Sequence, residues 1–404
     1  MSKPISDLYS EKAKSAPGPY FPRPSVPVKF NFDQGSPAPE TYPVDDFAEY
    51  AKRVILQAGP GGCDYVATGM DEMTRGYTGL REQLAARISR RDGREVGPDG
   101  LMLVNGSSHG LALIAAAFLN PGDGAVVEAL SFPYMVGYMA SAGANIATVP
   151  LDGDGMDVDA VETRLKEFAA AGVRPKMVYT IPTFQVPTGT VLSLDRRRRL
   201  VELAREWDVI VVEDNCYYEK YFDEPPPPTL FSLDESGLVI QSDSFSKMLA
   251  PSLRLGYVAG TPDALKALDG VRQDLGVNQI IPRMVEAYIA DGKLDPHLAR
   301  ARVINRRKRD IALDALRRYC EPWVRFRVPG GGIYFWLELS PQVDWEQVRE
   351  RAVADGVACR PGERFTGDDS GKGFLRLSFL HVSEEEIERG IGVLGKALSA
   401  SVIA

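Results

Sequence analysis

The chain has 404 residues, of which 44% are hydrophobic and 25% are charged. This composition is that of an ordinary soluble globular protein, and it excludes intrinsic disorder and fibrous repeats. A formal net charge of −8 disfavours nonspecific binding to nucleic acid or to an anionic membrane surface. Small molecules are therefore the expected partners.

Cysteines and histidines are few and scattered. The four cysteines and three histidines show no spacing typical of a metal site or a disulfide framework. The first 24 residues lack the apolar core of a secretory signal, and no stretch reaches the roughly 20 apolar residues of a membrane span. We therefore expect a cytoplasmic protein with no metal and no membrane contact.

The first 45 residues are rich in proline, which predicts an extended N-terminal arm lying on a body formed elsewhere. Short apolar runs then alternate with segments of helical spacing, which predicts a large α/β domain over residues 60–290. Its three layers would be a mostly parallel sheet with helices on both faces. The expected strands are 101–104, 125–127, 146–149, 177–180 and 209–212, and the expected helices are 80–91, 111–119 and 194–207.

The pattern changes after about residue 295 and predicts a smaller α+β domain over residues 295–404. Four consecutive basic residues, 306–309, are interpreted as a solvated helix face because the chain as a whole is acidic. The expected helices are 298–317, 345–355 and 384–398, and the expected strands are 324–328, 333–337 and 374–379.

Lys247 lies among small hydroxyl residues, just after the apolar run 238–240 and shortly before Arg254. A lysine amine forms an imine with an aldehyde, and hydroxyls with a guanidinium fork hold a phosphate. The segment therefore indicates a site for a phosphorylated aldehyde cofactor. The alternative is a surface loop with a solvated lysine.

Two further polar segments follow predicted strands. The strand 209–212 runs into Glu213 and Asp214, which places Asp214 at the carboxyl end of the strand, where α/β proteins bind ligands. Ser107 and Ser108 precede a predicted helix whose first N–H groups suit a phosphate. A loop cap for Asp214 and a simple helix cap for the serines remain the alternatives.

These segments occur in an order and spacing that resembles class I/II pyridoxal-phosphate-dependent aminotransferases of fold type I, in particular the 2-aminoadipate and aromatic aminotransferase branch. The resemblance covers about residue 30 to residue 404, and residues 182–189, 329–336 and 374–379 are also similar to family motifs. It implies pyridoxal 5′-phosphate as the cofactor. It also implies a homodimer with active sites between subunits and between the two domains.

The resemblance implies roles for individual residues. Lys247 would hold the cofactor as an aldimine and carry a proton between Cα and the cofactor. Asp214 would keep the pyridine nitrogen protonated, and Tyr217 would donate to the 3′-oxygen. Residues that would bind the phosphate are Ser107, Ser108, Ser244, Ser246 and Arg254.

Three residues are expected to contact the ring or the substrate. Phe132 would stack on the ring, with Tyr134 as its rival and core packing as the alternative for both. Arg376 would bind the substrate α-carboxylate in a bidentate manner, the alternative being an exposed strand arginine. Gly35 would lie beside the substrate.

Four positions depart from the family pattern. Val186 replaces an Asn, so one donor to the 3′-oxygen is missing and the internal aldimine is expected to have a higher pKa than in relatives. Asp71 replaces a Tyr that reaches the phosphate across the dimer interface. His109 replaces a Gln and is either a second acid/base group or a packing residue. The polar arm 33–37 predicts a polar or cationic substrate.

The leading hypothesis is an aminotransferase that moves the α-amino group of an amino acid to a 2-oxo acid. The alternative is a pyridoxal-phosphate enzyme of specialised metabolism that uses the same carbanion for elimination, γ-replacement, oxidation or cyclisation. A DNA-binding regulator with an aminotransferase-like domain is a third hypothesis. It needs an N-terminal helix-turn-helix domain, for which the first 60 residues are too short and too rich in proline.

Overall fold

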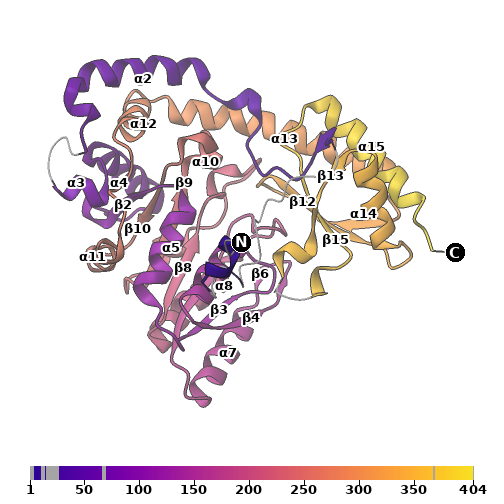
Figure 1. Ribbon diagram of the computed structural model, residues 1–404, viewed down its shortest axis with the longest axis horizontal. Coiled ribbons are helices and arrows are strands. Elements are labelled where there is room, and N and C mark those ends of the chain that lie inside the picture. Colours follow the sequence, from indigo (N-terminus) through magenta and orange to yellow (C-terminus); the bar gives the residue numbers. More distant parts are fainter. Residues whose placement is uncertain (1–3, 11–13, 15–26, 66–69, 367–368, 404) are drawn as a thin grey trace.

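The computed structural model describes residues 4–10, 14, 27–65, 70–366 and 369–403. A large sheet lies at the centre of the α/β body, and a second, smaller sheet lies at the end that carries the C-terminus (Figure 1). None of the described helices is both long and apolar enough to cross a membrane.

The large sheet has seven strands in the order β2-β10-β9-β8-β7-β3-β4. The expectation of a mostly parallel sheet is confirmed, because all pairings except those of β10 are parallel, whereas β10 is antiparallel to both neighbours. The predicted strands are confirmed within a few residues, and β10 is the strand that the sequence analysis missed. The bounds are β2 (Leu101–Val104), β3 (Gly124–Glu128), β4 (Asn145–Val149), β7 (Pro175–Thr180), β8 (Ile210–Asp214), β9 (Val239–Ser244) and β10 (Gly256–Ala259).

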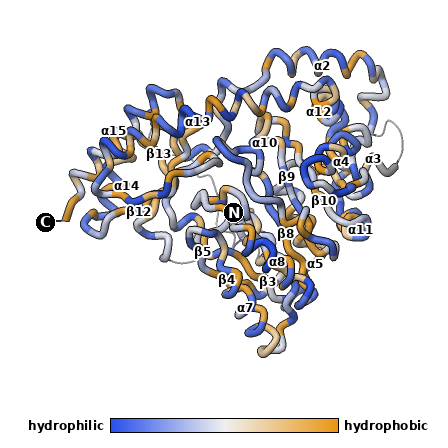
Figure 2. The backbone as a smooth tube through the Cα atoms, turned by 180° about the vertical axis from the view of Figure 1, so that it is seen from behind, coloured by the Kyte–Doolittle hydropathy of each residue, from blue (hydrophilic) through white to orange (hydrophobic). Residues whose placement is uncertain are grey.

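Successive side chains of a strand point to opposite faces of the sheet. Apolar residues therefore lie on both faces, and helices cover both. Along β2, Met102 and Val104 join one apolar core, and Leu101 and Leu103 join another. In Figure 2 the hydrophobic strand β8 contrasts with the largely hydrophilic helix α8 (Leu194–Trp207), which packs against it. The first core includes residues of α5 (Ser107–Phe118), α6 (Pro133–Ser141) and α11 (Pro262–Val271), and the second includes residues of α4 (Thr78–Asp92), α7 (Val158–Ala170), α8 and α12 (Ile280–Ala290).

The smaller sheet is antiparallel, with the order β11-β12-β15-β14. The N-terminal arm joins this part of the molecule, since β1 (Phe30–Asn31) pairs with β13 (Val357–Ala358). The predicted mixture of helices and strands is present, whereas the domain limits 1–45, 60–290 and 295–404 stay a prediction. The elements are β11 (Val324–Phe326), β12 (Tyr334–Leu339), β14 (Arg360–Pro361), β15 (Phe374–Ser378), α13 (Leu294–Tyr319), α14 (Trp345–Ala354) and α15 (Glu384–Ser399).

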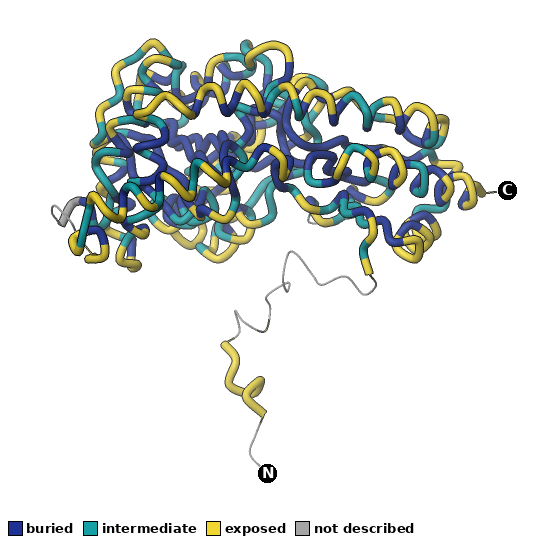
Figure 3. The backbone as a smooth tube through the Cα atoms, turned by 90° about the horizontal axis from the view of Figure 1, so that it is seen from above, coloured by how far each residue is buried: buried dark blue, intermediate teal, exposed yellow. Residues whose placement is uncertain are grey.

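A helix that the sequence analysis did not predict, α2 (Val44–Ala58), follows the arm and packs on α12. Its Tyr50 hydroxyl donates to Asp291 at 2.7 Å. Residues 4–10 are exposed and extend away from the body (Figure 3). The remaining elements are α3 (Met70–Arg75), α9 (Leu230–Leu233), α10 (Phe245–Met248), β5 (Leu151–Asp152) and β6 (Gly155–Met156).

The basic cluster 306–309 on α13 is only half solvated, so the interpretation as a solvated face is wrong for two of its residues. Arg306 and Arg307 are exposed, but Lys308 and Arg309 are buried. The Lys308 ammonium donates to the carbonyls of Leu380 and Val382, each at 2.8 Å. It also pairs with the arm residue Glu40 at 2.6 Å. This lysine therefore joins α13, the loop after β15 and the arm.

We predict that Lys308→Met lowers the free energy of unfolding by about 2–4 kcal/mol, because two buried carbonyls lose their donor. Arg307→Met is the matched control. Arg307 is 70% exposed and pairs with Glu384, so its loss should cost less than about 1 kcal/mol. Urea unfolding measures both values, and equal losses in the two variants would contradict the interpretation.

Candidate active site

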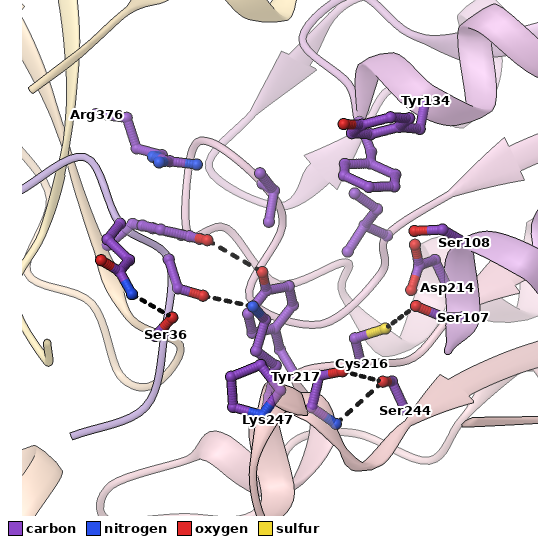
Figure 4. A pocket seen from close by; sticks show the side chains of 18 of the residues that line it. Ser36, Ser107, Ser108, Tyr134, Asp214, Cys216, Tyr217, Ser244, Lys247 and Arg376 are labelled. Atoms are coloured by element: carbon purple, nitrogen blue, oxygen red, sulfur yellow. Dashed lines mark hydrogen bonds between the residues drawn. The ribbon is translucent and has the colours of Figure 1, made fainter. Parts of the chain in front are cut away.

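A cavity of about 370 Å³ lies between the large sheet, the arm and the smaller sheet. Its lining includes every residue that the sequence analysis assigned to the cofactor or the substrate: Gly35, Ser107, Ser108, Phe132, Asp214, Tyr217, Ser244, Ser246, Lys247, Arg254 and Arg376. Arg376 lies on one side of the cavity and Ser107 and Ser108 on the other, with Lys247 between them (Figure 4). The structure thus brings together residues up to 341 positions apart in the chain.

The strand register explains how the sheet edge gathers these groups. Asp214, the last residue of β8, lies opposite Ser242 of β9. Because β10 is antiparallel, its first residue, Gly256, lies at this same edge, opposite both Ser244 and Val104. The unpredicted direction of β10 therefore brings the preceding Arg254 to the ends of β2 and β9.

Lys247 lies on the short helix α10, directly after β9. Ser244 caps that helix by accepting a hydrogen bond from the backbone N–H of Ser246 at 3.1 Å. The Lys247 ammonium donates to the backbone carbonyl of Gly35 on the arm. A Cβ atom at position 35 would overlap the Tyr334 hydroxyl, so glycine lets the arm approach this closely.

Asp214 lines the cavity, and one of its carboxylate oxygens has no hydrogen-bond partner among the described residues. One carboxylate oxygen, Oδ2, accepts a hydrogen bond from the Tyr179 hydroxyl at 2.9 Å. The other, Oδ1, is buried and has no partner among the described residues. Burial raises the pKa of Asp214, and the hydrogen bond from Tyr179 opposes that rise. An ionised carboxylate here would be stabilised by a protonated nitrogen placed at Oδ1.

The phosphate-binding candidates cluster at the start of α5 and around α10. Ser107 and Ser108 are the first two residues of α5, and the preceding Gly106 has φ +81°. The Ser244 and Ser246 hydroxyls lie 2.9 Å apart. Arg254 also lines this end of the cavity. Free helix N–H groups, hydroxyls and a guanidinium together form a site suited to a dianion.

The opposite end of the cavity holds Arg376 on β15. Its guanidinium lies 4.3 Å from the centre of the Tyr334 ring. The side chain is buried, contrary to the alternative of an exposed strand arginine. The Tyr334 hydroxyl lies 3.2 Å from that of Tyr217. Burial is the main cause that raises the pKa of Tyr217 well above 10, and the neighbouring Tyr334 is the second. The Tyr217 hydroxyl therefore stays protonated at neutral pH.

Two aromatic side chains form one wall of the cavity. The rings of Phe132 and Tyr134 lie 5.3 Å apart at 44°, and both line the cavity. The geometry does not choose between them as a stacking partner, although Phe132 also packs against the core. Val186, also in the lining, is buried.

His109 and Asp71 add nothing to the site as described. His109 accepts from the backbone N–H of Asn105 at 3.3 Å and lies 3.7 Å from Asp274. Its side chain is not part of the cavity lining, which favours the packing role. The side chain of Asp71 lies outside the described residues.

Several lining residues had no assigned role in the sequence analysis. Gln34 and Ser36 flank Gly35, and the Gln34 amide donates to the Ser36 hydroxyl at 3.2 Å. The Cys216 thiol donates to Ser107 at 3.2 Å. Tyr334 lies within the family-like segment 329–336, and Cys216 follows Asp214 by two positions, so the sequence alone could have suggested both as lining residues. It could not have suggested the contact between Cys216 and Ser107.

Comparisons with known proteins identify the family. The model of aminotransferase class I and II matches residues 72–394. The chain belongs to this family. It is 36% identical to the aromatic-amino-acid aminotransferase 1 of Thermococcus litoralis, over 90% of this chain and 86% of that one. It is 34% identical to the 2-aminoadipate transaminase of Thermus thermophilus, over 92% and 90%.

A solved structure agrees with these relatives. The α-aminoadipate aminotransferase of Thermus thermophilus, complexed with N-(5′-phosphopyridoxyl)-L-leucine, matches with a TM-score of 0.89 and 32% identity. The match covers 98% of this chain and 99% of the other. The predicted fold type I is therefore confirmed, and the cofactor of this aminotransferase is pyridoxal phosphate.

The described residues fit that cofactor. The unpaired Oδ1 of Asp214 suits a protonated ring nitrogen, and the serines with Arg254 suit the phosphate. Lys247 lies between these two groups and Arg376 (Figure 4). The described residues thus include separate candidate groups for the ring nitrogen and for the phosphate of pyridoxal phosphate.

Glu128, at the end of β3, supports the loop that borders this cavity. It accepts hydrogen bonds from the Thr180 hydroxyl at 2.6 Å and from the Gln185 amide at 3.1 Å. Burial raises its pKa from 4.5 to about 7, although these hydrogen bonds oppose the rise. Between pH 4.5 and 7 the folded protein therefore retains a proton that the unfolded chain has lost. Such a group makes the free energy of unfolding fall as the pH rises through this range.

We predict that Glu128→Gln reduces this loss of stability. Between about pH 5 and 7 the unfolding free energy of the variant should fall by roughly 2 kcal/mol less than that of the wild type, at about 1.4 kcal/mol per pH unit. The exposed Glu338 gives the control, Glu338→Gln, which should follow the wild type. Urea unfolding at both pH values provides the measurement, and parallel curves for Glu128→Gln and the wild type would refute the assignment.

Proposed function

We propose that this aminotransferase transfers the α-amino group of an amino acid to a 2-oxo acid by means of Lys247, Asp214 and Arg376. One observation carries the proposal: an amine, an unpaired buried carboxylate oxygen and a buried guanidinium line the same cavity. These groups match the aldehyde and ring nitrogen of pyridoxal phosphate and the α-carboxylate of an amino acid. The names of the relatives, which are aminotransferases, support the same reaction.

Each of the proposed catalytic residues has a role that follows from its position in the cavity. Arg376 binds the α-carboxylate and thereby fixes the orientation of Cα. The Lys247 amine takes the proton from Cα and would deliver it to the C4′ carbon of the cofactor. Tyr217, protonated at neutral pH, donates a hydrogen bond to the 3′-oxygen. Pyridoxal phosphate, when bound, supplies an electron-poor ring that accepts the electron pair left at Cα. Asp214 keeps that ring protonated.

The cavity favours amino acids with a neutral side chain. Its walls near Arg376 carry the polar Gln34 and Ser36 and the aromatic Tyr334. Among the described lining residues, Asp214 is the one carboxylate. The Asp33 carboxylate of the arm is bound to Arg360, so the expectation of a cationic substrate loses its basis. The polar part of that expectation remains.

A single-turnover assay tests the reaction. Stoichiometric holoenzyme mixed with phenylalanine, leucine or glutamine should yield pyridoxamine phosphate and one equivalent of the matching 2-oxo acid, without ammonia. Lysine and aspartate should react at least about tenfold more slowly, because the charged side chains among the described lining residues are already assigned to the cofactor and to the α-carboxylate. Lys247→Ala serves as the control and should yield neither product. Release of ammonia, or aspartate as the best donor, would contradict the proposal.

We propose in addition that the chain acts as a homodimer in the cytoplasm. Exposed apolar side chains around α2 support a partner surface, namely Ile55, Leu56 and Tyr65. The four cysteines are free thiols, which suits a reducing compartment. Sedimentation equilibrium should give twice the mass of one chain, and a monomer at micromolar concentration would contradict the dimer.

A further inference from the structure

Two arginines lie side by side at the substrate end of the cavity. Arg360 of β14 and Arg376 of β15 are direct partners across their antiparallel strands. Their side chains are 3% and 4% exposed. Two buried guanidiniums in register repel each other unless an anion lies between them.

Asp33 of the arm supplies that anion, but it serves the two arginines unequally. Its two carboxylate oxygens accept from Nε and Nη2 of Arg360, each at 2.5 Å. The same carboxylate lies 3.5 Å from Nη2 of Arg376. Arg376 Nη2 instead donates to the backbone carbonyl of Asp33, at 2.5 Å. The bidentate pair therefore belongs to Arg360, and Arg376 keeps donors for another carboxylate, including a buried Nε without a partner among the described residues.

We propose that Arg360 is a positioning residue that holds the Asp33 carboxylate away from Arg376, so that Arg376 remains open to the α-carboxylate of the substrate. This inference rests on the proposed role of Arg376. Without Arg360, the Asp33 carboxylate, which already lies 3.5 Å from Nη2 of Arg376, forms with it the bidentate pair that a substrate would otherwise form. The arm then becomes a competitive inhibitor within the chain.

Charge leads to the same expectation. Taken by themselves, the side chains of Arg360, Arg376 and Asp33 carry one net positive charge, which attracts a substrate anion. Loss of Arg360 makes the group neutral, and loss of the Asp33 charge gives it two positive charges. Loss of both the Arg360 and the Asp33 charges restores one net positive charge. Affinity for a carboxylate should therefore follow the net charge of the group.

A purely structural role for Arg360 as an anchor of the arm makes a different prediction. The arm has other anchors, since the Ser378 hydroxyl donates to the Gln34 carbonyl at 2.9 Å and the Ser378 N–H donates to the Phe32 carbonyl at 2.8 Å. These contacts are unaffected by changes at positions 33 and 360. If anchoring were the role, removing Asp33 and Arg360 together would be at least as harmful as removing Arg360 alone.

The test measures binding of 3-phenylpropanoate, a carboxylate without an amino group, to the pyridoxal-phosphate holoenzyme by isothermal titration calorimetry. Arg360→Met should raise its Kd at least about tenfold, and Asp33→Asn should lower it at least about twofold. The double variant should lie within about threefold of the wild type. Arg318→Met is the control. Arg318 pairs with Glu388 at 2.9 Å, with its side chain 62% exposed, and its loss should leave the Kd unchanged.

The inference is overturned if Arg360→Met binds within about twofold of the wild type, or if the double variant binds as weakly as Arg360→Met. If Arg360→Met does not fold, Asp33→Asn decides, since weaker binding by that variant contradicts the charge argument. Arg376→Ala separates this inference from the proposed function. Unchanged binding by Arg376→Ala removes the role of Arg376 itself, whereas weak binding by Arg376→Ala with normal binding by Arg360→Met removes the role of Arg360 alone.

Discussion

The arrangement of the cavity depends on a buried carboxylate that is only half satisfied. The Tyr179 hydroxyl donates a hydrogen bond to one carboxylate oxygen of Asp214, and the other oxygen has no partner among the described residues. A buried, unpaired acceptor costs about 1–3 kcal/mol, and more when it is charged. The protein retains this cost at the end of a central strand, where a protonated ring nitrogen can offset it. Cofactor binding and the stability of the site are therefore linked through one atom.

The substrate side of the cavity comes from chain segments remote from Asp214. The arm brings Gly35 to the Lys247 ammonium and Asp33 to the two arginines of the smaller sheet. One short polar segment thus contacts both the amine and the proposed carboxylate site. The Asp33 carboxylate of this segment binds Arg360 and leaves Arg376 available for the substrate α-carboxylate. The arm therefore contributes to substrate specificity as well as linking the parts of the structure.

The parallel strands and part of the lining could be predicted from local signals in the sequence, whereas Tyr217, Phe132 and Arg376 were assigned from the resemblance to the family. Apolar runs mark the strands, and Lys247, Asp214 and Ser107 each follow one. The antiparallel direction of β10 could not be predicted, because a short apolar run has the same pattern in a parallel and in an antiparallel strand. The pairing of Asp33 with Arg360 spans 327 positions and depends on strand register. The burial of Lys308 was missed because a run of like charges resembles a solvated face, although its neighbours alternate between inside and outside along α13.

Reduction of the holoenzyme with borohydride, followed by peptide mass spectrometry, is the most direct test of the site. The account predicts one phosphopyridoxyl group per chain, on the peptide that contains Lys247, and a large loss of cofactor affinity in Asp214→Ala with the fold retained. A label on another lysine, or an Asp214→Ala variant that binds pyridoxal phosphate as tightly as the wild type, would contradict it.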